Sequence, residues 1–427
     1  MTSLHLLLWI AGGILLQLAI YMGVEFWGHW QAYRTLRGVV KEFDLAVTTA
    51  VPVDVQEPVT AAWSGLRTFH VERKVLEDAT EQVCSFYLVP EDGKPLPPFL
   101  PGQFLTFRLD VPSAQGGAEA VIRCYSLSDA PQHGHYRVSI KRAPAPVGSA
   151  VLPGISSNYF HDHVQVGSQL QVRAPSGHFH IDRGDAPVVL IGGGIGITPM
   201  LSMLSWSLAE QTGREVWLFY GVRNRTELVM LTQLQALATQ HTNFHLHLCL
   251  SDPQPADLDG RRTGPVHHHH SRVDVALLRR LLPLKPYHFY ICGPTPMLAS
   301  LVPALEDWGV PDAHIHFEAF GPASVKRRKT AMSAAAVPGD TSDTVMVTFA
   351  KTQKQLPWQP GMGSLLDFAE AHGIAVASGC RAGGCGSCQT TIRSGEVAYT
   401  QSPDFDPEPG SCLLCVCTPK TAVTLEA

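Results

Sequence analysis

The stretch GCRAGGCGSCQTT, residues 379–391, holds three of the ten cysteines of the chain within nine positions. Cys380, Cys385 and Cys388 follow a C-x4-C-x2-C spacing, and most of the residues between them are glycine, alanine or serine. Small residues let a loop wrap closely around a bound group, because glycine tolerates unusual dihedral angles and leaves main-chain N–H groups accessible. The stretch therefore predicts a loop that binds an inorganic centre through thiolates.

This spacing is typical of a plant-type [2Fe–2S] cluster, whose fourth thiolate comes from farther along the chain. Cys412, Cys415 and Cys417 are the candidates. The segment LLCVCTP, residues 413–419, resembles the Leu-x-Cys-x-x-x-Pro ending of ferredoxin-like domains, and this resemblance implies Cys415 as the ligand, with Cys417 as the alternative. Structural zinc is disfavoured, because zinc sites usually contain two C-x-x-C pairs.

The composition indicates a multidomain globular protein. Its 427 residues carry 32 basic and 37 acidic side chains, a balance that gives no sign of a nucleic-acid partner. The 37 glycines and 32 prolines favour a strand-rich protein with many turns over a helical bundle.

The N-terminus contains one long apolar segment. Residues 4–24 hold no charged side chain and, as a helix, would extend about 30 Å, enough to cross a bilayer. Arg34, Arg37 and Lys41 follow the segment and no basic residue precedes it, which predicts a single-pass protein of the inner (cytoplasmic) membrane with its catalytic domains in the cytoplasm. A cleaved signal peptide is the alternative, but it would have the opposite charge order. The reducing cytoplasm argues against disulfides for the cysteine cluster.

Two changes of pattern divide the remaining chain. Short β-rich runs, from RTFHVERKVLE at 67–77 to LQVRAPSG at 170–177, are typical of an antiparallel β-barrel. Apolar strands then alternate with helical segments up to HIHFEAF at 314–320, as in a doubly wound parallel α/β sheet. The last part combines short strands, a helix at SLLDFAEAHG (364–373) and the cysteines, which predicts an α+β domain of the β-grasp type.

Six parts are thus predicted. They are a transmembrane anchor with its juxtamembrane segment at 1–42, a linker at 43–63, the barrel at 64–184, the α/β domain at 185–321, a second linker at 322–343 and the cysteine-containing domain at 344–427.

The barrel region contains the run RCYSLS, residues 123–128. Arg123, Tyr125 and Ser126 match the R-x-Y-S motif of the ferredoxin-NADP reductase superfamily, which this chain resembles. The resemblance implies that the arginine pairs with a flavin pyrophosphate, that the tyrosine packs on the flavin, and that the serine hydroxyl reaches flavin N5. These roles suit a bidentate cation, an aromatic face and a small hydrogen-bond donor.

A second segment refines the choice of flavin. Residues 154–161, GISSNYFH, resemble the G-x-x-S segment that holds the pyrophosphate at a helix start in FAD-type members. The resemblance implies that Gly154, Ser156 and Ser157 bind the cofactor. It favours FAD over FMN.

The α/β region begins with GGGIGITP, residues 192–199, between an apolar strand and a helical pattern. That is the context of a nucleotide-binding glycine loop, in which glycines let a pyrophosphate approach the main chain. Gly194, Gly196, Thr198 and Pro199 fit the G-x-G-x-x-P form of the superfamily. A tight strand-to-helix turn without a ligand is the alternative.

Cys292, Gly293 and Pro294 directly follow the apolar run YHFYI, at the carboxyl edge where doubly wound sheets bind ligands. The resemblance implies that Cys292 lies beside the nicotinamide C4 and helps to orient hydride transfer. Phe320 matches the aromatic residue that covers the flavin, with a core phenylalanine as the alternative.

Two further motifs are less specific. Arg223, in the loop after the second strand of the α/β domain, is of the type that accepts a 2′-phosphate and in isolation favours NADPH. The YGVR form, residues 220–223, also occurs in the NADH-using oxygenase reductases that the chain resembles, which favours NADH and leaves NADPH possible. The four histidines at 267–270 are predicted to form a solvated loop.

From about residue 64 to 427, the order of domains resembles the phthalate dioxygenase reductase-like oxygenase reductases. The resemblance implies hydride transfer from NAD(P)H to FAD, with Ser126, Thr198 and Cys292 as catalytic residues, and one-electron transfer to a [2Fe–2S] cluster. The anchor, which soluble members lack, favours a membrane-embedded or membrane-associated acceptor such as an oxygenase, hydroxylase or desaturase. The alternatives are a membrane quinone or ferric-chelate reductase, a reductase of a soluble hybrid-cluster protein, and a non-catalytic redox sensor.

Overall fold

The computed structural model describes most of the chain after residue 62, namely residue 63 and residues 65–112, 116–132, 134–145, 153–258, 265–320, 344–379, 381, 383–400, 403 and 405–427. The predicted transmembrane segment lies outside these residues, as does the second linker. No helix in the described part of the chain is long and apolar enough to span a membrane. All described elements belong to the unit Ala61–Ala427.

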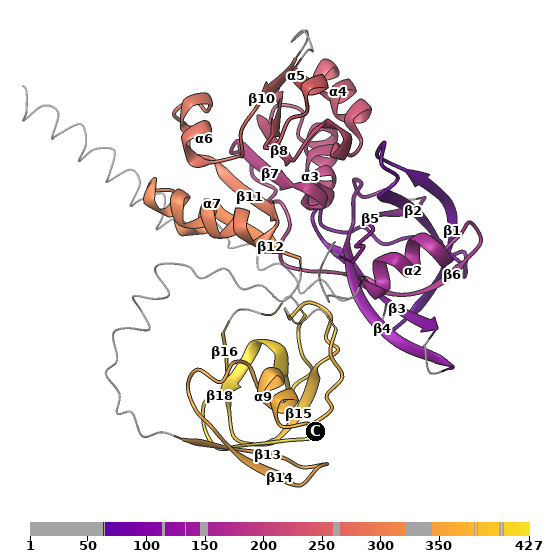
Figure 1. Cartoon of the computed structure of the whole chain (residues 1–427), viewed down its shortest axis with the longest axis vertical. Helices are drawn as coiled ribbons and strands as arrows, with labels where there is room; N and C mark the ends of the chain where they lie inside the picture. The colour runs from indigo at the N-terminus through magenta and orange to yellow at the C-terminus, as the bar shows by residue number, and fades with distance from the viewer. Residues whose placement is uncertain are drawn as a thin grey trace, which may run out of the picture. The chain divides into compact units, whose positions relative to one another are not determined.

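The first part is an antiparallel barrel (Figure 1). Its strands are β1 (Arg67–Leu76), β2 (Val83–Pro90), β3 (Phe104–Pro112), β4 (Ala118–Ser126), β5 (Tyr136–Lys141) and β6 (Gln169–Ser176). They pair in the order β4-β3-β6-β1-β2-β5. A bridge between Leu127 and Val138 joins the ends of this row, so the sheet closes on itself. The predicted barrel is therefore confirmed.

Alternating apolar residues fill the barrel. Phe69, Phe86 and Phe107 are fully buried and belong to one core cluster. Helix α2 (Ile155–His163) contributes Phe160, whose ring lies 5.2 Å from Phe86 and 5.3 Å from Phe107. Trp63, the last residue of the predicted first linker, also packs on the barrel and donates from Nε1 to the carbonyl of Val172 at 3.3 Å.

The second part is a parallel sheet with helices on both faces. Its strands are β7 (Val188–Gly193), β8 (Val216–Val222), β9 (Phe244–Leu250), β10 (Val266–His269), β11 (His288–Gly293) and β12 (Ile315–Ala319). The helical elements are η1 (Gly194–Gly196), α3 (Ile197–Glu210), η2 (Arg225–Glu227), α4 (Leu231–Gln240), α5 (Pro255–Leu258), α6 (Val275–Leu281), α7 (Thr295–Asp307) and η3 (Asp312–His314). The order β10-β9-β8-β7-β11-β12 is that of a doubly wound fold, as predicted.

Burial on both faces explains the sequence of these strands. Every residue of β7 is buried, as expected where helices cover both sides of a parallel sheet. Helices α3 and α4 share one core cluster with the sheet, and α6 and α7 share the other. The chain leaves β7 toward β8 and returns on the opposite side as β11, so the topological switch point, where such sheets bind ligands, lies between β7 and β11.

The histidine run is not a solvated loop, and that prediction was wrong. Residues 266–269 form the edge strand β10, paired in parallel with β9. The His267 ring stacks on His247 at 4.6 Å, and His269 Nε2 lies 2.9 Å from His247 Nδ1. Aromatic stacking between β9 and β10 and the otherwise unpaired edge of β9 favour the strand. Neither can be inferred from the sequence of residues 267–270 alone.

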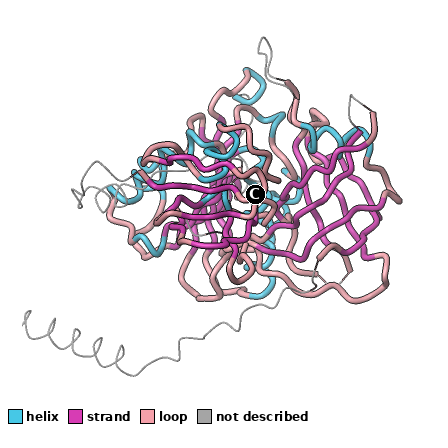
Figure 2. The backbone as a smooth tube through the Cα atoms, turned by 90° about the horizontal axis from the view of Figure 1, so that it is seen from below, coloured by secondary structure: helices cyan, strands magenta, loops and turns pink. Residues whose placement is uncertain are grey.

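The third part is a mixed sheet with one helix. Its elements are β13 (Val345–Phe349), β14 (Lys354–Trp358), α9 (Leu365–Ala371), β15 (Gln389–Ser394), β16 (Val397–Tyr399), β17 (Ser411–Leu413), η4 (Leu414–Val416), β18 (Cys417–Pro419) and β19 (Val423–Leu425). The main sheet has the order β14-β13-β19-β15-β17. Figure 2 shows the strands of the described residues in magenta and the helices in cyan. Strands β13 and β19 are parallel and α9 packs into the same core, as in the predicted β-grasp fold. Ser364 and Asp367 form a capping box that starts α9.

Candidate functional site

The end of β4 brings Tyr125 against α2. Its ring lies 5.3 Å from Phe160 and 5.8 Å from Phe107 in edge-on geometry, and its hydroxyl lies 2.9 Å from Ser156 Oγ. Burial raises the pKa of Tyr125 to about 12, so the phenol stays neutral. Tyr125 and Ser156, predicted from separate motifs to bind the same cofactor, thus meet.

Ser126 presents an orphaned polar atom. Its Oγ is buried and has no hydrogen-bond partner within the described residues. A buried hydroxyl without a partner costs about 1–3 kcal/mol, so its presence fits a site that a bound hydrogen-bond acceptor completes. Arg123 donates from Nη1 to the carbonyl of Ile122 at 2.7 Å, which holds the guanidinium beside β4.

The start of α2 is built from the predicted G-x-x-S segment. Gly154 is the N-cap residue, and the amide of Asn158 donates to its carbonyl at 2.8 Å. Ser157 Oγ accepts from the main-chain N–H of Ala143 at 3.3 Å, which links the helix start to the segment after β5. The helix has no acidic residue in its first turn, so its N-terminus suits an anion such as a pyrophosphate.

The glycine loop turns directly from β7 into α3. Gly194 adopts a φ of +54°, and a side chain there would meet no atom within 4 Å, so the loop is open on this side. A Cβ on Gly196 would lie 2.2 Å from the carbonyl oxygen of Cys292, so only glycine permits this approach to β11. Thr198 is buried and its Oγ1 donates to the carbonyl of Ile195 at 3.0 Å, while Pro199 is buried in the first turn of α3.

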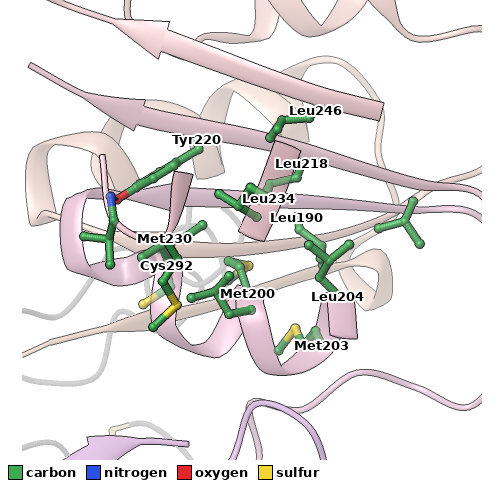
Figure 3. Packing of buried hydrophobic residues seen from close by; sticks show 14 of the residues in the cluster. Leu190, Met200, Met203, Leu204, Leu218, Tyr220, Met230, Leu234, Leu246 and Cys292 are labelled. Carbon is green, nitrogen blue, oxygen red and sulfur yellow. Dashed lines mark hydrogen bonds between the residues drawn. The ribbon is translucent and has the colours of Figure 1, made fainter. Parts of the chain in front are cut away.

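Cys292, the last residue but one of β11, pairs with Gly192 of β7 and is fully buried. Figure 3 shows it beside Met200 and Met230 in the cluster under α3 and α4. Burial, and secondarily the charge of Glu318, raises the pKa of the Cys292 thiol well above its usual value, so the thiol stays protonated at neutral pH.

Gly293 and Pro294 continue from Cys292 into α7, with Pro294 as the N-cap residue. A Cβ on Gly293 would lie 2.9 Å from Met297 Sδ and 3.1 Å from the Cα of Gly193, so the two strand ends of the switch point approach through their main chains. The predicted residues of the nicotinamide site therefore lie together at one edge of the sheet.

A cleft of about 320 Å³ adjoins the glycine loop, lined by Gly194 and by residues of the β8–α4 segment and the barrel. Lys141, at the end of β5, brings positive charge to it from the barrel, whereas Arg142, the next residue, also lines the cleft but is paired with Asp162 at 2.7 Å. Sequence reasoning missed both residues, although a basic pair at a strand end was the available signal.

Arg223 lies at the same cleft and is exposed, but its charge is already paired. Its Nε donates to Glu227 Oε1 at 2.7 Å. Burial disfavours ionisation of Glu227, yet the hydrogen bonds from Arg223 outweigh it and hold the pKa of the carboxyl below its usual value. Glu227 was not predicted as a site residue.

In the cysteine loop, Cys385 and Cys388 are buried. Cys388 Sγ lies 3.2 Å from Sγ of Cys415 in η4. Cys417 instead forms a thiol hydrogen bond with Cys412, and both are fully buried. Cys380, the fourth member of the predicted ligand set, lies outside the described residues, and among those described no group of three or more His, Cys, Asp or Glu could hold a metal ion.

The thiols nevertheless fit a cluster in chemistry and enclosure. Cys388 and Cys415 approach from distant parts of the chain, as predicted from the spacing and the C-terminal pattern. Gly383 and Gly386 adopt φ values of +78° and +69°, which side chains disfavour. The four-cysteine assignment remains a prediction, to which the Cys388–Cys415 contact adds support.

Comparisons with known proteins agree with this geometry. Three family models match in succession: an oxidoreductase FAD-binding domain at 85–181, an oxidoreductase NAD-binding domain at 190–302 and a 2Fe-2S iron-sulfur cluster binding domain at 347–420. The solved structure of phthalate dioxygenase reductase is 26% identical with a TM-score of 0.50, covering 85% of this chain and 98% of that chain. The chain belongs to the ferredoxin-NADP reductase superfamily.

Two further relatives match a shorter part of the chain. The flavohemoprotein of Halalkalibacterium halodurans is 38% identical over 262 residues, which are 61% of each chain, so the match spans about three fifths of that relative. The flavohem-like FAD/NAD-binding domain of the nitric oxide dioxygenase from Vibrio cholerae O1 biovar El Tor is 33% identical, with a TM-score of 0.51, covering 60% of this chain and 100% of that chain.

As a ferredoxin-reductase-type oxidoreductase, the chain has domains for FAD, a nicotinamide cofactor and a [2Fe–2S] cluster, which confirms the predicted cofactors. Phe320 follows β12 and is 45% exposed, so the alternative of a core phenylalanine was wrong. Its predicted position over the flavin remains a prediction.

Proposed function

We propose that this protein is a membrane-anchored NADH-dependent reductase that passes electrons through FAD and a [2Fe–2S] cluster to a one-electron acceptor. The observation that carries the proposal is a contact between the two redox domains. Arg173, in β6 of the FAD-binding barrel, donates from Nη1 to the main-chain carbonyl of Cys385 at 3.3 Å. A cysteine loop that touches the flavin domain offers electrons a short path within one chain.

When bound, FAD accepts a hydride and the cluster carries single electrons onward. The residues of this chain bind and orient. Ser126 offers its unpartnered hydroxyl to the flavin, and the open side of Gly194 admits the nicotinamide pyrophosphate. The protonated thiol of Cys292 is buried at the switch point and adds no charge there, and Lys141 supplies positive charge at the cleft. Thr198, whose hydroxyl donates a hydrogen bond to the carbonyl of Ile195, stabilises the conformation of the glycine loop.

The pairing of Arg223 with Glu227 supports NADH over NADPH. An unpaired arginine would attract a 2′-phosphate, whereas a carboxylate at the same place repels it and accepts from a ribose hydroxyl. Replacing Glu227 by Gln removes the negative charge. We expect the ratio of kcat/KM for NADPH to that for NADH to rise about tenfold, a change of about 1.4 kcal/mol. Glu210→Gln, at the exposed end of α3, is the matched control; equal ratios in both variants would refute this role of Glu227.

The membrane part of the proposal rests on the sequence of residues 4–24 and on the basic residues that follow. We propose a single-pass anchor in the inner membrane, with the catalytic domains in the cytoplasm and a membrane-associated oxygenase, hydroxylase or desaturase as acceptor. Confinement to the membrane would raise the frequency of encounters with such a partner. Removing residues 1–42 should release the protein from membranes and leave NADH-to-dye activity intact; a truncated protein that still sediments with membranes contradicts the anchor.

The decisive experiment is an anaerobic titration of the full-length protein with NADH and, on a fresh sample, with NADPH. We expect NADH to bleach both the flavin and the iron–sulfur absorption at low stoichiometry. Bleaching of the flavin alone would contradict the electron path and favour direct reduction of a quinone or ferric chelate. In that case Cys385→Ser would leave acceptor reduction unchanged.

A further inference from the structure

The barrel has a partly covered row of residues on its outer face. Thr106 of β3 pairs with Cys124 of β4 on one side and with Arg173 of β6 on the other. Phe107, the next residue of β3, belongs to the barrel core, so Thr106 points to the opposite face. Thr106 is nonetheless only 3% exposed, and Cys124 and Arg173 beside it are half-buried, so this part of the outer face is shielded from solvent.

The cysteine loop of the iron–sulfur domain contacts this face. Arg173 Nη1 donates to the carbonyl of Cys385 at 3.3 Å, and the centre of its guanidinium lies 5.9 Å from the ring centroid of Phe405. The Phe405 ring in turn packs on the loop, since a Cβ on Gly386 would lie 2.6 Å from it. One guanidinium therefore bridges a carbonyl of the cysteine loop and a ring that packs on this loop from a later part of the chain.

A second contact lies on the neighbouring strand. A Cβ on Gly379 would lie 3.3 Å from the carbonyl oxygen of Ile122 in β4 and 2.8 Å from Cys385 Sγ. The loop thus meets the barrel at β4 and at β6, on both sides of β3. Because Gly379 has no side chain, it lets the loop approach β4. Arg173 adds a polar side-chain contact between the barrel and the loop.

The chemistry of arginine suits this position. A guanidinium stays charged at all working pH values, donates in a fixed plane and can stack on an aromatic ring at the same time. Its donation to the carbonyl of a cysteine that we assign to the cluster brings positive charge to the place where reduction adds negative charge. Hydrogen bonds and net charge around the sulfurs are known determinants of the potential of such clusters.

We propose that Arg173 is a positioning residue for electron transfer between the flavin and the cluster. It holds the Cys385 end of the loop against the barrel and raises the reduction potential of the cluster. This inference rests on the proposed function, in which NADH supplies two electrons and the cluster takes up one at a time from the reduced flavin.

The test uses the full-length holoprotein and three variants. Arg173→Ala removes the bridge, Arg173→Lys keeps the charge without the planar fork, and Arg393→Ala removes an arginine of the iron–sulfur domain that pairs with Glu426. Redox titration followed by electron paramagnetic resonance gives the potential of the cluster. Anaerobic stopped flow with NADH separates flavin bleaching from cluster bleaching. Iron content and the visible spectrum report whether the cluster is assembled.

We expect normal iron content and normal flavin bleaching in Arg173→Ala, with cluster reduction slowed about tenfold, the size of one charge-assisted hydrogen bond. An equal tenfold change in the one-electron equilibrium would lower the cluster potential by about 59 mV. Arg173→Lys keeps the charge but not the planar fork, so it should restore the cluster potential more fully than the rate of cluster reduction. Arg393→Ala should match the wild type in both quantities.

Two results would overturn the proposal. One is an Arg173→Ala protein whose potential and rate both equal those of the wild type. The other is an Arg173→Ala protein that loses part of its iron, while the molecules that keep the cluster reduce it at the wild-type rate. Arg173 would then only support the fold of the loop. If the wild type itself does not reduce its cluster with NADH, the proposed function fails, and this outcome is distinct from both.

Discussion

The glycine loop and the cysteine loop are both rich in small residues, yet they are held in different ways. The glycine loop, residues 192–199, is fixed by main chain against main chain, with Gly196 against the carbonyl of Cys292. The cysteine loop is held by side chains from elsewhere, including the thiol of Cys415 and the ring of Phe405. The first contact cannot yield without moving a strand, whereas the second can adjust. A nucleotide site built this way is rigid, and a cluster site built this way responds to its surroundings.

The largest effect is expected from Cys388→Ser, which breaks the cysteine loop and leaves the glycine loop untouched. A serine oxygen is a poor substitute for a thiolate ligand. We expect the cluster absorption and the iron content to fall to near zero, while NADH still bleaches the flavin at the wild-type rate. Cys417→Ala is the matched control and should keep the cluster, if Cys415 is the fourth ligand. Loss of the cluster in Cys417→Ala but not in Cys415→Ala would reverse that assignment.

Gly196→Ala tests the rigidity of the glycine loop. Its Cβ would lie 2.2 Å from the Cys292 carbonyl oxygen, a main-chain atom that no rotamer change can remove. We expect a loss of about 2–3 kcal/mol in the free energy of unfolding, as for overpacking, and flavin reduction by NADH slowed about a hundredfold. Denaturant unfolding and stopped flow measure the two effects. Gly213→Ala, in a turn where a Cβ meets no atom within 4 Å, is the control.

Unchanged hydride transfer in Gly196→Ala would show that the loop can move after all. The rigidity on which the comparison depends would then be wrong, even if the protein were destabilised.

The same comparison explains what could be predicted from the sequence. Of the switch-point residues, Gly196 comes shortly after β7 and Cys292 lies near the end of β11. Parallel strands bring such residues to one edge of the sheet whatever the details of packing. The contact of Arg173 with Cys385 joins residues 212 positions apart, and no local pattern announces it. The histidines of β10 were misassigned for a similar reason, because an edge strand is defined by its partner. Glu227 was missed because its role depends on the charge of Arg223 beside it.

Gly386→Ala should cost less than Gly196→Ala, although its Cβ would also overlap an atom, 2.6 Å from the Phe405 ring. A ring can move, so the main cost is the φ of +69°, about 1 kcal/mol. We expect a small loss of thermal stability and a cluster that reduces more slowly, since Phe405 also stacks with Arg173. Phe405→Ala in the same chain should remove the overlap. If the loss of stability in the double variant is no smaller than the sum of the losses in the two single variants, the ring is not what resists the added methyl group.

The last effect, which is absent at neutral pH and appears only on acidification, should separate the two regions by stability. His247 in β9 is 3% exposed, and its ring stacks on Phe219 at 4.6 Å. Burial, aided by the neighbouring histidines of β9 and β10, lowers the pKa of His247 to about 3. The unfolded chain therefore takes up this proton first as the pH falls below about 6.5, so the stabilisation is present above that pH and is lost progressively toward pH 3.

One proton corresponds to a slope of about 1.4 kcal/mol per pH unit within that window. Hydrogen exchange should show β8 and β9 losing protection on acidification before β13 and β19 do. His247→Asn keeps a polar group near the position of Nδ1, which contacts His269, but does not titrate, so the slope should flatten even if the variant is less stable throughout. An unchanged slope would place the acid sensitivity elsewhere in the sheet. In that case the protonation of His247 would not affect the stability of the sheet that carries the glycine loop.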